Sequence, residues 1–217
     1  MRRQVSLWLI SLALLFALPS VRAWETVIDE PGLRVEQRLY AGSPLMEIRG
    51  TTYLQASLGA IMTLLRDDDY NDQWVYRSGG ARILSEQGNT QAYVYGIVDA
   101  PWPIADRDTI VRFDYRQAPD TGVINIDITN FPDFAPREPG LIRVPEFGGF
   151  WRLTPGKDGR VEVIYQVHGD PGGWVPTWLA NRAAVLSVTR TLQNMPLAVS
   201  RYRGATPDYV REVDSLH

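Results

Sequence analysis

The stretch Asp170-Pro-Gly-Gly-Trp-Val-Pro-Thr-Trp-Leu-Ala-Asn181 decides the fold of this chain. Pro171 and the two glycines that follow it predict a sharp turn at the end of a strand. Pro176 suits the first turn of a helix, where a missing N–H costs nothing. The sequence therefore predicts a strand that leads directly into a helix, which we expect to run to about Tyr202.

Apolar side chains recur at steps of three and four residues along this expected helix. They form one stripe, in which Asn181 is the polar member: Trp178, Asn181, Val185, Val188, Leu192, Met195, Val199 and Tyr202. A helix with one apolar stripe packs that stripe on another apolar surface. We expect this surface to be a sheet.

Most of the chain before this helix alternates between apolar and polar residues, which is typical of strands that are dry on one face only. Pairs of strands are predicted at 33–40 with 45–53, 82–86 with 91–99, 108–117 with 122–129 and 149–154 with 161–169, and a short strand at 141–144. A shorter helix is predicted at 55–66. The expected fold is α+β, with seven to nine antiparallel strands in a curved sheet that wraps around the C-terminal helix.

The two ends of the chain differ in composition from the expected domain at 24–203. Arg2 and Arg3 precede an apolar run, and small residues end at Ala23, which is the pattern of a cleaved signal peptide over residues 1–23. The alternative is an uncleaved membrane anchor, but the apolar run is shorter than the roughly 20 residues that a span requires. We therefore expect an exported, periplasmic protein, with a polar tail over residues 204–217.

Charge and cysteine content exclude several classes of protein. The chain has 22 basic and 25 acidic residues, and loss of Arg2, Arg3 and Arg22 with the signal would make it more acidic. Such a balance argues against a nucleic-acid partner. Because the sequence contains no cysteine, it has neither a disulfide nor a lipoprotein anchor. We expect a monomer.

Four motifs, in this order along the chain, resemble the START (StAR-related lipid-transfer) domain family. They are Pro101-Trp-Pro-Ile-Ala-Asp-Arg-Asp108, Gly140-Leu-Ile-Arg143, Gly149-Phe-Trp-Arg-Leu-Thr-Pro155 and the stretch 170–181. The resemblance implies a helix-grip fold, in which a U-shaped antiparallel sheet and the C-terminal helix enclose one lipid. It also implies possible transient contact with a membrane.

One position departs from the family pattern. Many members have an arginine on the cavity face where this chain has Phe113, and an acidic partner where this chain has Gly80 or Ala81. We therefore expect a cavity that is close to uniformly apolar. If a polar anchor exists, the candidates are Tyr95, Tyr115, Tyr165 and His168.

The alternation and the helix stripe together predict which side chains line the cavity. The expected lining residues are Val111, Phe113, Tyr115, Ile124, Ile126, Ile128, Trp151, Tyr165, Trp178, Val185, Val188 and Leu192. Three aromatic residues on loops, Trp102, Phe131 and Phe134, are candidates for a gate or a lip that touches a membrane. The alternative for these three is ordinary packing of loops over the ends of the sheet.

No set of residues in the sequence indicates catalysis or a bound metal. His168 is a possible base, but a single histidine at a strand end is more often structural. Arg107 and Asp108 are either a functional ion pair or a pair that stabilises the loop before their strand. The acidic run Asp67-Asp-Asp69 lacks the spaced oxygen ligands of a calcium loop. We expect a lipid carrier without cofactor; the alternative is an enzyme of the helix-grip superfamily, similar to a cyclase or aromatase, that acts on a hydrophobic substrate in the same cavity.

Overall fold

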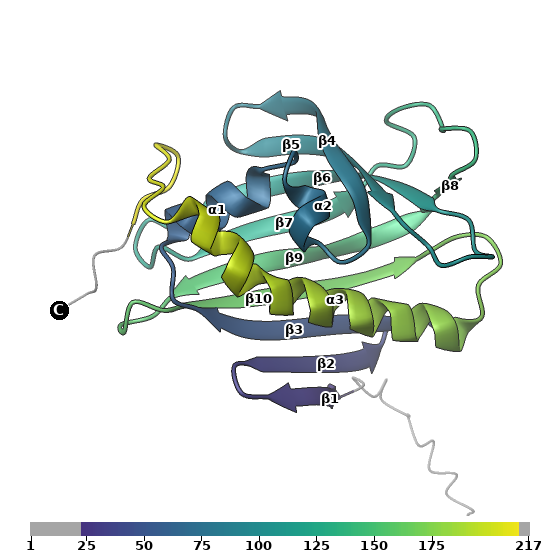
Figure 1. Ribbon diagram of the computed structural model, residues 1–217, viewed down its shortest axis with the longest axis horizontal. Coiled ribbons are helices and arrows are strands. Elements are labelled where there is room, and N and C mark those ends of the chain that lie inside the picture. Colours follow the sequence, from purple (N-terminus) through teal and green to yellow (C-terminus); the bar gives the residue numbers. More distant parts are fainter. Residues whose placement is uncertain (1–22, 213–217) are drawn as a thin grey trace, which may run out of the picture.

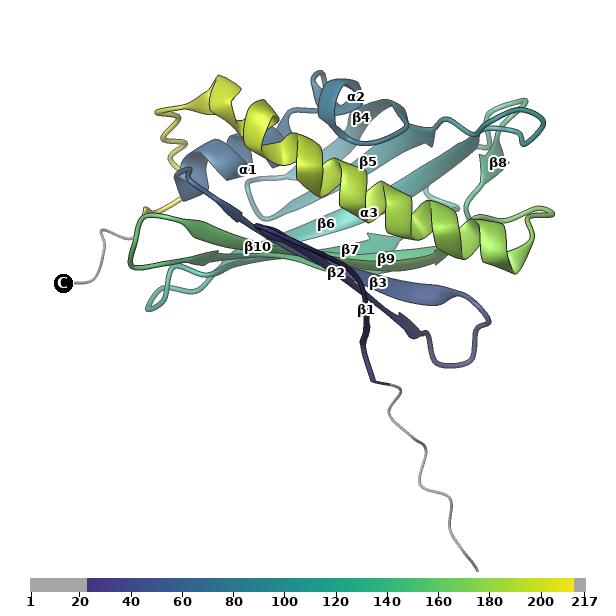
Figure 2. The ribbon, with the colours of Figure 1, turned by 60° about the horizontal axis from the view of Figure 1, so that its bottom comes forward.

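A long helix lies across the concave face of one curved, ten-stranded sheet (Figures 1 and 2). The computed structural model describes residues 23–212. Its strands are β1 (Glu25–Glu30), β2 (Leu33–Leu39), β3 (Met46–Leu54), β4 (Ser78–Gln87), β5 (Gln91–Val98), β6 (Arg107–Gln117), β7 (Ile124–Asn130), β8 (Ile142–Arg143), β9 (Glu146–Pro155) and β10 (Val161–Asp170). Its helices are α1 (Leu58–Arg66), α2 (Asn71–Trp74) and α3 (Thr177–Val199), followed by the 3₁₀ turn η1 (Ser200–Tyr202).

The strands pair in the order β1-β2-β3-β10-β9-β7-β6-β5-β4, and every neighbour in this order is antiparallel. β8 pairs with β6 in parallel and stands outside the order. The expected α+β helix-grip fold is confirmed. The sequence did not predict β1 or α2, because β1 is mostly polar and exposed and α2 is a single turn of four residues.

Residues that pair across antiparallel strands place their side chains on the same face of the sheet. One line of such residues on the concave face runs from Val35 through Gly50, Tyr165, Trp151 and Ile126 to Tyr115. A second line runs from Gln37 through Ile48, Val167, Gly149 and Ile128 to Phe113 and Ala92. The register therefore gathers residues from seven strands on the concave face.

Helix α3 sits on the sheet at Gly50. A Cβ atom on Gly50 would lie 2.3 Å from Leu192 Cδ1 and 2.7 Å from Val188 Cγ1. The missing side chain therefore lets the helix approach the backbone of β3. Val188, Leu192, Met195 and Val199 of the predicted stripe are buried. Trp178 is 67% exposed, so its expected place in the covered stripe is wrong.

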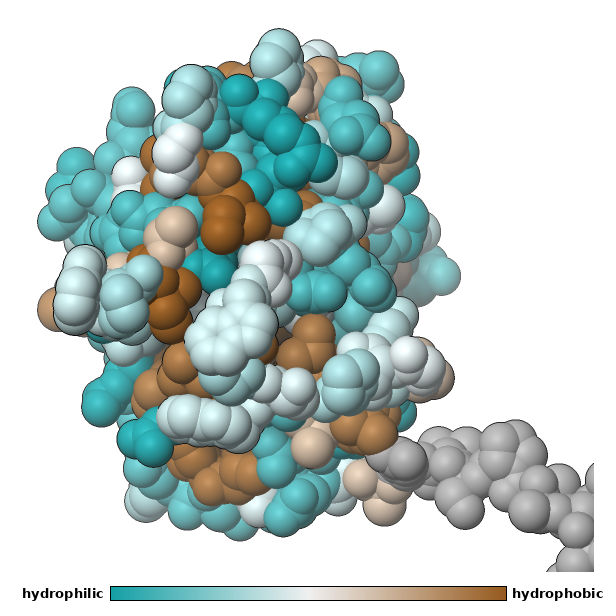
Figure 3. Space-filling model, turned by 90° about the vertical axis from the view of Figure 1, so that its right-hand side faces the viewer, coloured by the Kyte–Doolittle hydropathy of each residue, from teal (hydrophilic) through white to brown (hydrophobic). Residues whose placement is uncertain are grey.

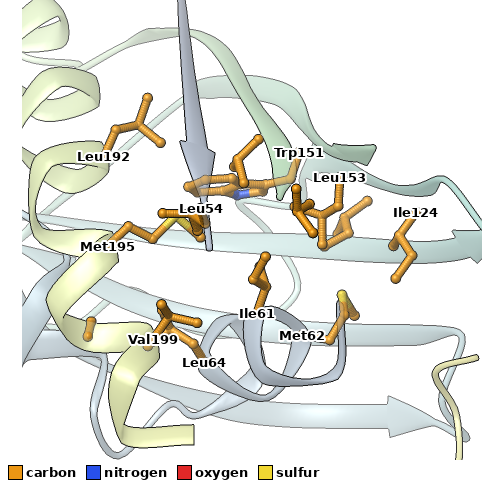
Figure 4. Close-up of a cluster of buried hydrophobic side chains, with 14 of the residues drawn as sticks. Leu54, Ile61, Met62, Leu64, Ile124, Trp151, Leu153, Leu192, Met195 and Val199 are labelled. Carbon is orange, nitrogen blue, oxygen red and sulfur yellow. The ribbon is translucent and has the colours of Figure 1, made fainter. Parts of the chain in front are cut away.

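The core continues from this contact to the short helix α1. Ser57 caps the start of α1, since its side chain accepts a hydrogen bond from the Ala60 N–H. Figure 4 shows α1 side chains next to those of the C-terminal part of α3 and the sheet. The buried residues drawn there include Leu54, Ile61, Met62, Leu64, Ile124, Trp151, Leu153, Leu192, Met195 and Val199. Within the described residues, no helix is long and apolar enough to cross a membrane.

Part of the predicted polar tail is attached to the domain. The Glu212 carboxylate accepts hydrogen bonds from the N–H groups of Leu58 and Gly59, at 3.1 and 2.6 Å, at the start of α1. The Gln117 side chain accepts from the Arg211 N–H at 2.9 Å and donates to the Arg211 carbonyl at 2.7 Å. These contacts tie Glu212 to α1 and Arg211 to β6. The predicted signal peptide lies outside the described residues, except for Ala23.

Candidate functional site

The concave face carries most of the side chains that the sequence predicts as cavity lining. The register places the predicted residues of β6, β7, β9 and β10 on the side of the sheet that faces α3. Val188 and Leu192 of α3 contribute from above, at Gly50. Their contact with a ligand stays a prediction.

This concave face is not completely filled. Ile124, Ile126, Ile128, Trp151, Val188 and Leu192 are buried in the core. Phe113, Tyr115, Tyr165 and Val185 keep accessible surface, although they pack against the same core. Helix α3 contacts the sheet mainly at β3 and β2. It therefore packs less closely on β6 and β7 than on these two strands. The result is a partly accessible apolar and aromatic surface on the concave face, and apolar, aromatic lining is typical of small-molecule sites.

A group of aromatic rings stands at the centre of this surface. The rings of Trp151 and Tyr165 stack, with centroids 3.8 Å apart and an interplanar angle of 8°. Trp74, at the end of α2, lies 6.5 Å from the Trp151 ring. The sequence around Trp74 has no periodicity, so it did not indicate that this residue belongs to the group.

Two tyrosines of the concave face are protonated at neutral pH. Burial raises the pKa of Tyr165 well above its usual value, and no charged or hydrogen-bonded group contributes to this shift. Burial also raises the pKa of Tyr115 to about 12, with the Arg66 charge acting in the opposite direction. The Arg66 guanidinium lies over the rings of Tyr115 and Tyr209, at 4.6 and 4.9 Å, and pairs with Glu86 at 2.9 Å. Neither phenol is therefore a base at neutral pH.

Phe113 lies on the concave face, at the position where many relatives have an arginine. Its partners in the neighbouring strands are Ala92 and Ile128. Ala81, at one of the two positions expected for the acidic partner, pairs with Gly96. These neighbours are apolar, so they give a charged head group no partner around Phe113.

Arg107 and Asp108 do not pair with each other. Asp108 accepts two hydrogen bonds from Arg143, which also donates to the carbonyls of Pro132, Ala135 and Pro136. Arg107 is 6% exposed and donates to the carbonyls of Ala105, Pro171 and Gly172. Both arginines hold loops in place, which favours the structural interpretation of the Arg107–Asp108 pair.

The loops that Arg107 joins carry exposed tryptophans at one end of the molecule. Trp102, after β5, is 93% exposed and Trp174, after β10, is 89% exposed. Trp178 follows in the first turn of α3. Figure 3 views this end and shows hydrophobic residues between paler and hydrophilic ones. The sequence did not single out Trp174, because it lies in the turn before α3 and outside the helix stripe.

Phe131 and Phe134 lie elsewhere. Both rings pack on Tyr93, and Phe134 stacks on it with centroids 4.1 Å apart. Tyr93 pairs with Arg112, whose guanidinium lies over Phe131, and both belong to the convex face. The structure therefore places these two candidate gate residues away from the concave face, in ordinary loop packing.

His168 also lies on the convex face, because the neighbouring residue Val167 is on the concave one. Its ring stacks on Tyr40, with centroids 3.7 Å apart, and its Nε2 is 3.4 Å from the Glu146 carboxylate.

A hollow of about 570 Å³ lies elsewhere, between the start of α1 and the end of α3, and none of the predicted cavity residues lines it. Within residues 23–212, no group of three His, Cys, Asp or Glu side chains could hold a metal ion.

Comparison with known proteins places this architecture in a family. The family model described as START domain matches residues 20–203. The chain belongs to the START domain family. A relative from Pseudomonas aeruginosa, an uncharacterised protein, is 33% identical over 178 residues, which cover 82% of this chain and 87% of the relative.

Two further similar proteins are named as lipid transfer proteins. Mouse phosphatidylcholine transfer protein is 27% identical over 192 residues, covering 84% of this chain and 86% of the mouse protein. The crystal structure of a STAR-related lipid transfer protein from Xanthomonas axonopodis has a TM-score of 0.76 and 34% identity, and covers 82% of this chain and 98% of that one. These START relatives support lipid binding and transfer in general.

Proposed function

We propose that this START domain binds one lipid-like molecule between the concave face of its sheet and α3, and carries it through the periplasm as a monomer. The observation that carries the proposal is the partly accessible apolar surface of Phe113, Tyr115, Tyr165 and Val185 on the concave face and α3. Removal of apolar ligand surface from water contributes about 25 cal/mol per Å². For a lipid this gives several kcal/mol, even after the cost of immobilising it.

The carrier is favoured over an enzyme by the chemistry of this surface. Its two titratable groups are the phenols of Tyr115 and Tyr165, which keep their protons at neutral pH. The histidine considered as a base lies on the other face of the sheet. General acid–base catalysis needs a group that titrates near the working pH, so the described concave face is better suited to holding a ligand than to reacting with it.

The tryptophan-bearing end is the part of the protein that would meet a membrane. Indole side chains prefer the interface between lipid and water. Arg107 donates hydrogen bonds to carbonyls in both the Trp102 loop and the Trp174 loop, so it holds the two loops together. Contact of this end with a bilayer would bring the membrane to the start of α3.

The contacts of Trp24, the first residue after the expected cleavage site, support export. β1 starts at Glu25, and the Trp24 ring lies beneath the guanidinium groups of Arg38 and Arg49, at 4.4 and 4.1 Å. Cleavage after Ala23 would leave this contact intact. N-terminal sequencing of protein from a periplasmic extract should give Trp24 first; an intact Met1 would refute export by a cleaved signal.

Lipid binding is tested with the protein purified from its native compartment. Mass spectrometry of an organic extract should find one class of apolar molecule in a ratio near one per chain. Phosphatidylcholine, from the name of the mammalian relatives, is the first ligand to test for transfer between vesicles. An extract without lipid, combined with no transfer of any lipid tested, would refute the proposal.

Trp102→Ala with Trp174→Ala should slow transfer between vesicles without reducing the affinity for a soluble ligand. Phe134→Ala is the matched control, since it removes an exposed aromatic ring on the convex face. Equal transfer by all variants would exclude the tryptophan end as the membrane contact.

A further inference from the structure

The indole N–H of Trp74 is a buried donor without an acceptor. Trp74 is 3% exposed, and Nε1 has no hydrogen-bond partner among the described residues. A buried polar group without a partner is rare, and it costs free energy comparable to a lost hydrogen bond. The ring belongs to the hydrophobic core under α3, and the Asn194 side chain of α3 donates to the Trp74 carbonyl at 2.9 Å. Core packing and the Asn194 hydrogen bond therefore hold Trp74 in place, but its indole N–H makes no hydrogen bond among the described residues.

The Trp74 ring is linked to a second polar side chain, Tyr165, through Trp151. Trp74 packs 6.5 Å from Trp151, which stacks on Tyr165 at 3.8 Å. The Tyr165 phenol is enclosed by protein, and burial alone raises its pKa. Its side chain nevertheless keeps accessible surface on the concave face. Tyr165 is therefore only partly covered on the face of the sheet that lies under α3.

Other polar candidates are engaged or lie outside this interior. Tyr95 is on the convex face, under Arg82 and beside Asp108. His168 stacks on Tyr40 on the same convex face. Tyr115 faces Arg66, whose charge is already paired with Glu86. Trp74 and Tyr165 differ from these residues. Both are largely enclosed by protein, and neither donor has an acceptor among the described residues.

We propose that Trp74 Nε1 and the Tyr165 hydroxyl form a polar anchor that selects a lipid carrying an uncharged oxygen acceptor, such as an ester, ketone or hydroxyl oxygen. The inference rests on the proposed lipid binding. It replaces the expectation of a uniformly apolar cavity. Both groups are neutral donors, and a buried carboxylate or phosphate would need a cation to offset its desolvation. The anchor therefore suits a neutral oxygen and not an anionic head group.

The test compares two pyrene-labelled chains of equal length, one ending in a methyl ester and one a plain alkane. Binding of each to the full mature chain is followed by pyrene fluorescence. The protein should bind the ester at least tenfold more tightly, because an unpaired buried donor costs as much as a hydrogen bond and about 1.4 kcal/mol corresponds to tenfold. Tyr165→Phe removes one atom and should reduce this preference to less than threefold. Trp74→Phe should reduce it too.

Tyr40→Phe is the matched control, since its ring stacks on the convex face, and it should keep the full preference. Tyr165→Phe should also leave the melting temperature of the ligand-free protein unchanged, because no internal hydrogen bond is lost. Equal binding of both chains by the parent protein, or an unchanged preference in Tyr165→Phe, overturns the anchor while lipid binding stands. Binding of neither chain, together with a lipid-free native extract, overturns the proposed function itself.

Discussion

Arg143 donates two hydrogen bonds to Asp108, from Nε to Oδ1 at 3.0 Å and from Nη2 to Oδ2 at 2.8 Å, and both side chains are fully buried. The same guanidinium donates to carbonyls at Pro132, Ala135 and Pro136. Hydrogen bonding to Asp108 raises the pKa of Arg143. This pair therefore fastens the loop after β7 to β6.

Asp108→Asn should destabilise the fold strongly, because it leaves the Arg143 charge buried without its partner. Loss of one member of a buried ion pair costs about 3–5 kcal/mol. Urea denaturation measures the change in the free energy of unfolding. The control is Asp127→Asn, which breaks the exposed pair of Asp127 with Arg116 and should cost no more than about 1 kcal/mol. Equal losses in the two variants would contradict the assigned role.

Gly50→Ala should destabilise by about 1–3 kcal/mol, since the new methyl group would overlap Leu192 and Val188. Thermal unfolding measures the effect. In the double variant with Leu192→Ala, the two costs should not add, because the second change makes room for the first. Gly96→Ala is the control on the same face, where a Cβ would meet Thr109 Oγ1 at 3.2 Å. If the Gly50 change were harmless, α3 would not sit as described.

Val188→Asp should abolish lipid binding and cost several kcal/mol of stability, because it buries an unpaired charge between α3 and β3. Arg190→Asp, on the exposed side of the same helix, is the control and should bind as the parent does. Binding is measured by fluorescence with a labelled lipid. A Val188→Asp protein that folds and binds normally would show that α3 does not cover the ligand.

Glu212→Ala should loosen the C-terminal segment and the start of α1, because two N–H groups of the helix lose their acceptor. Loss of a helix cap costs about 0.5–2 kcal/mol. Amide hydrogen exchange at Leu58 and Gly59 should become faster. Asp208→Ala, an exposed acidic residue four positions earlier, should leave this exchange unchanged. Unaltered exchange in Glu212→Ala would show that the carboxylate does not protect α1.

Alkaline pH should destabilise the protein through Tyr115, whose pKa burial raises to about 12 from 10. Below pH 10 the Tyr115 phenol is protonated in both the folded and the unfolded protein. Between pH 10 and 12 the unfolded chain loses it first, so the free energy of unfolding falls as pH rises through this window. Tyr115→Phe should make this fall shallower in urea titrations at pH 9–12. A slope equal to that of the parent would mean that the phenol is solvated.

The sequence by itself determined most of the strands, the long helix and the face of each strand on which most predicted residues lie. Alternation and helical spacing are local properties, because each depends on the residues two to four positions away. This is why Val111, Phe113 and Tyr115 could be assigned to one face of their strand before the strands were paired. The departure at Phe113 was visible in the sequence for the same reason.

Only the tertiary structure decided which members of a pattern are covered. Trp178 obeys the helix spacing but stands in the first turn of α3, where it is exposed. Phe134 lies on a loop that Arg143 draws to the convex face. Trp74 and Tyr165 come from α2 and β10, and no local pattern brings them together. Their neighbourhood depends on strand pairing and helix packing between distant segments, which the spacing of nearby residues does not encode.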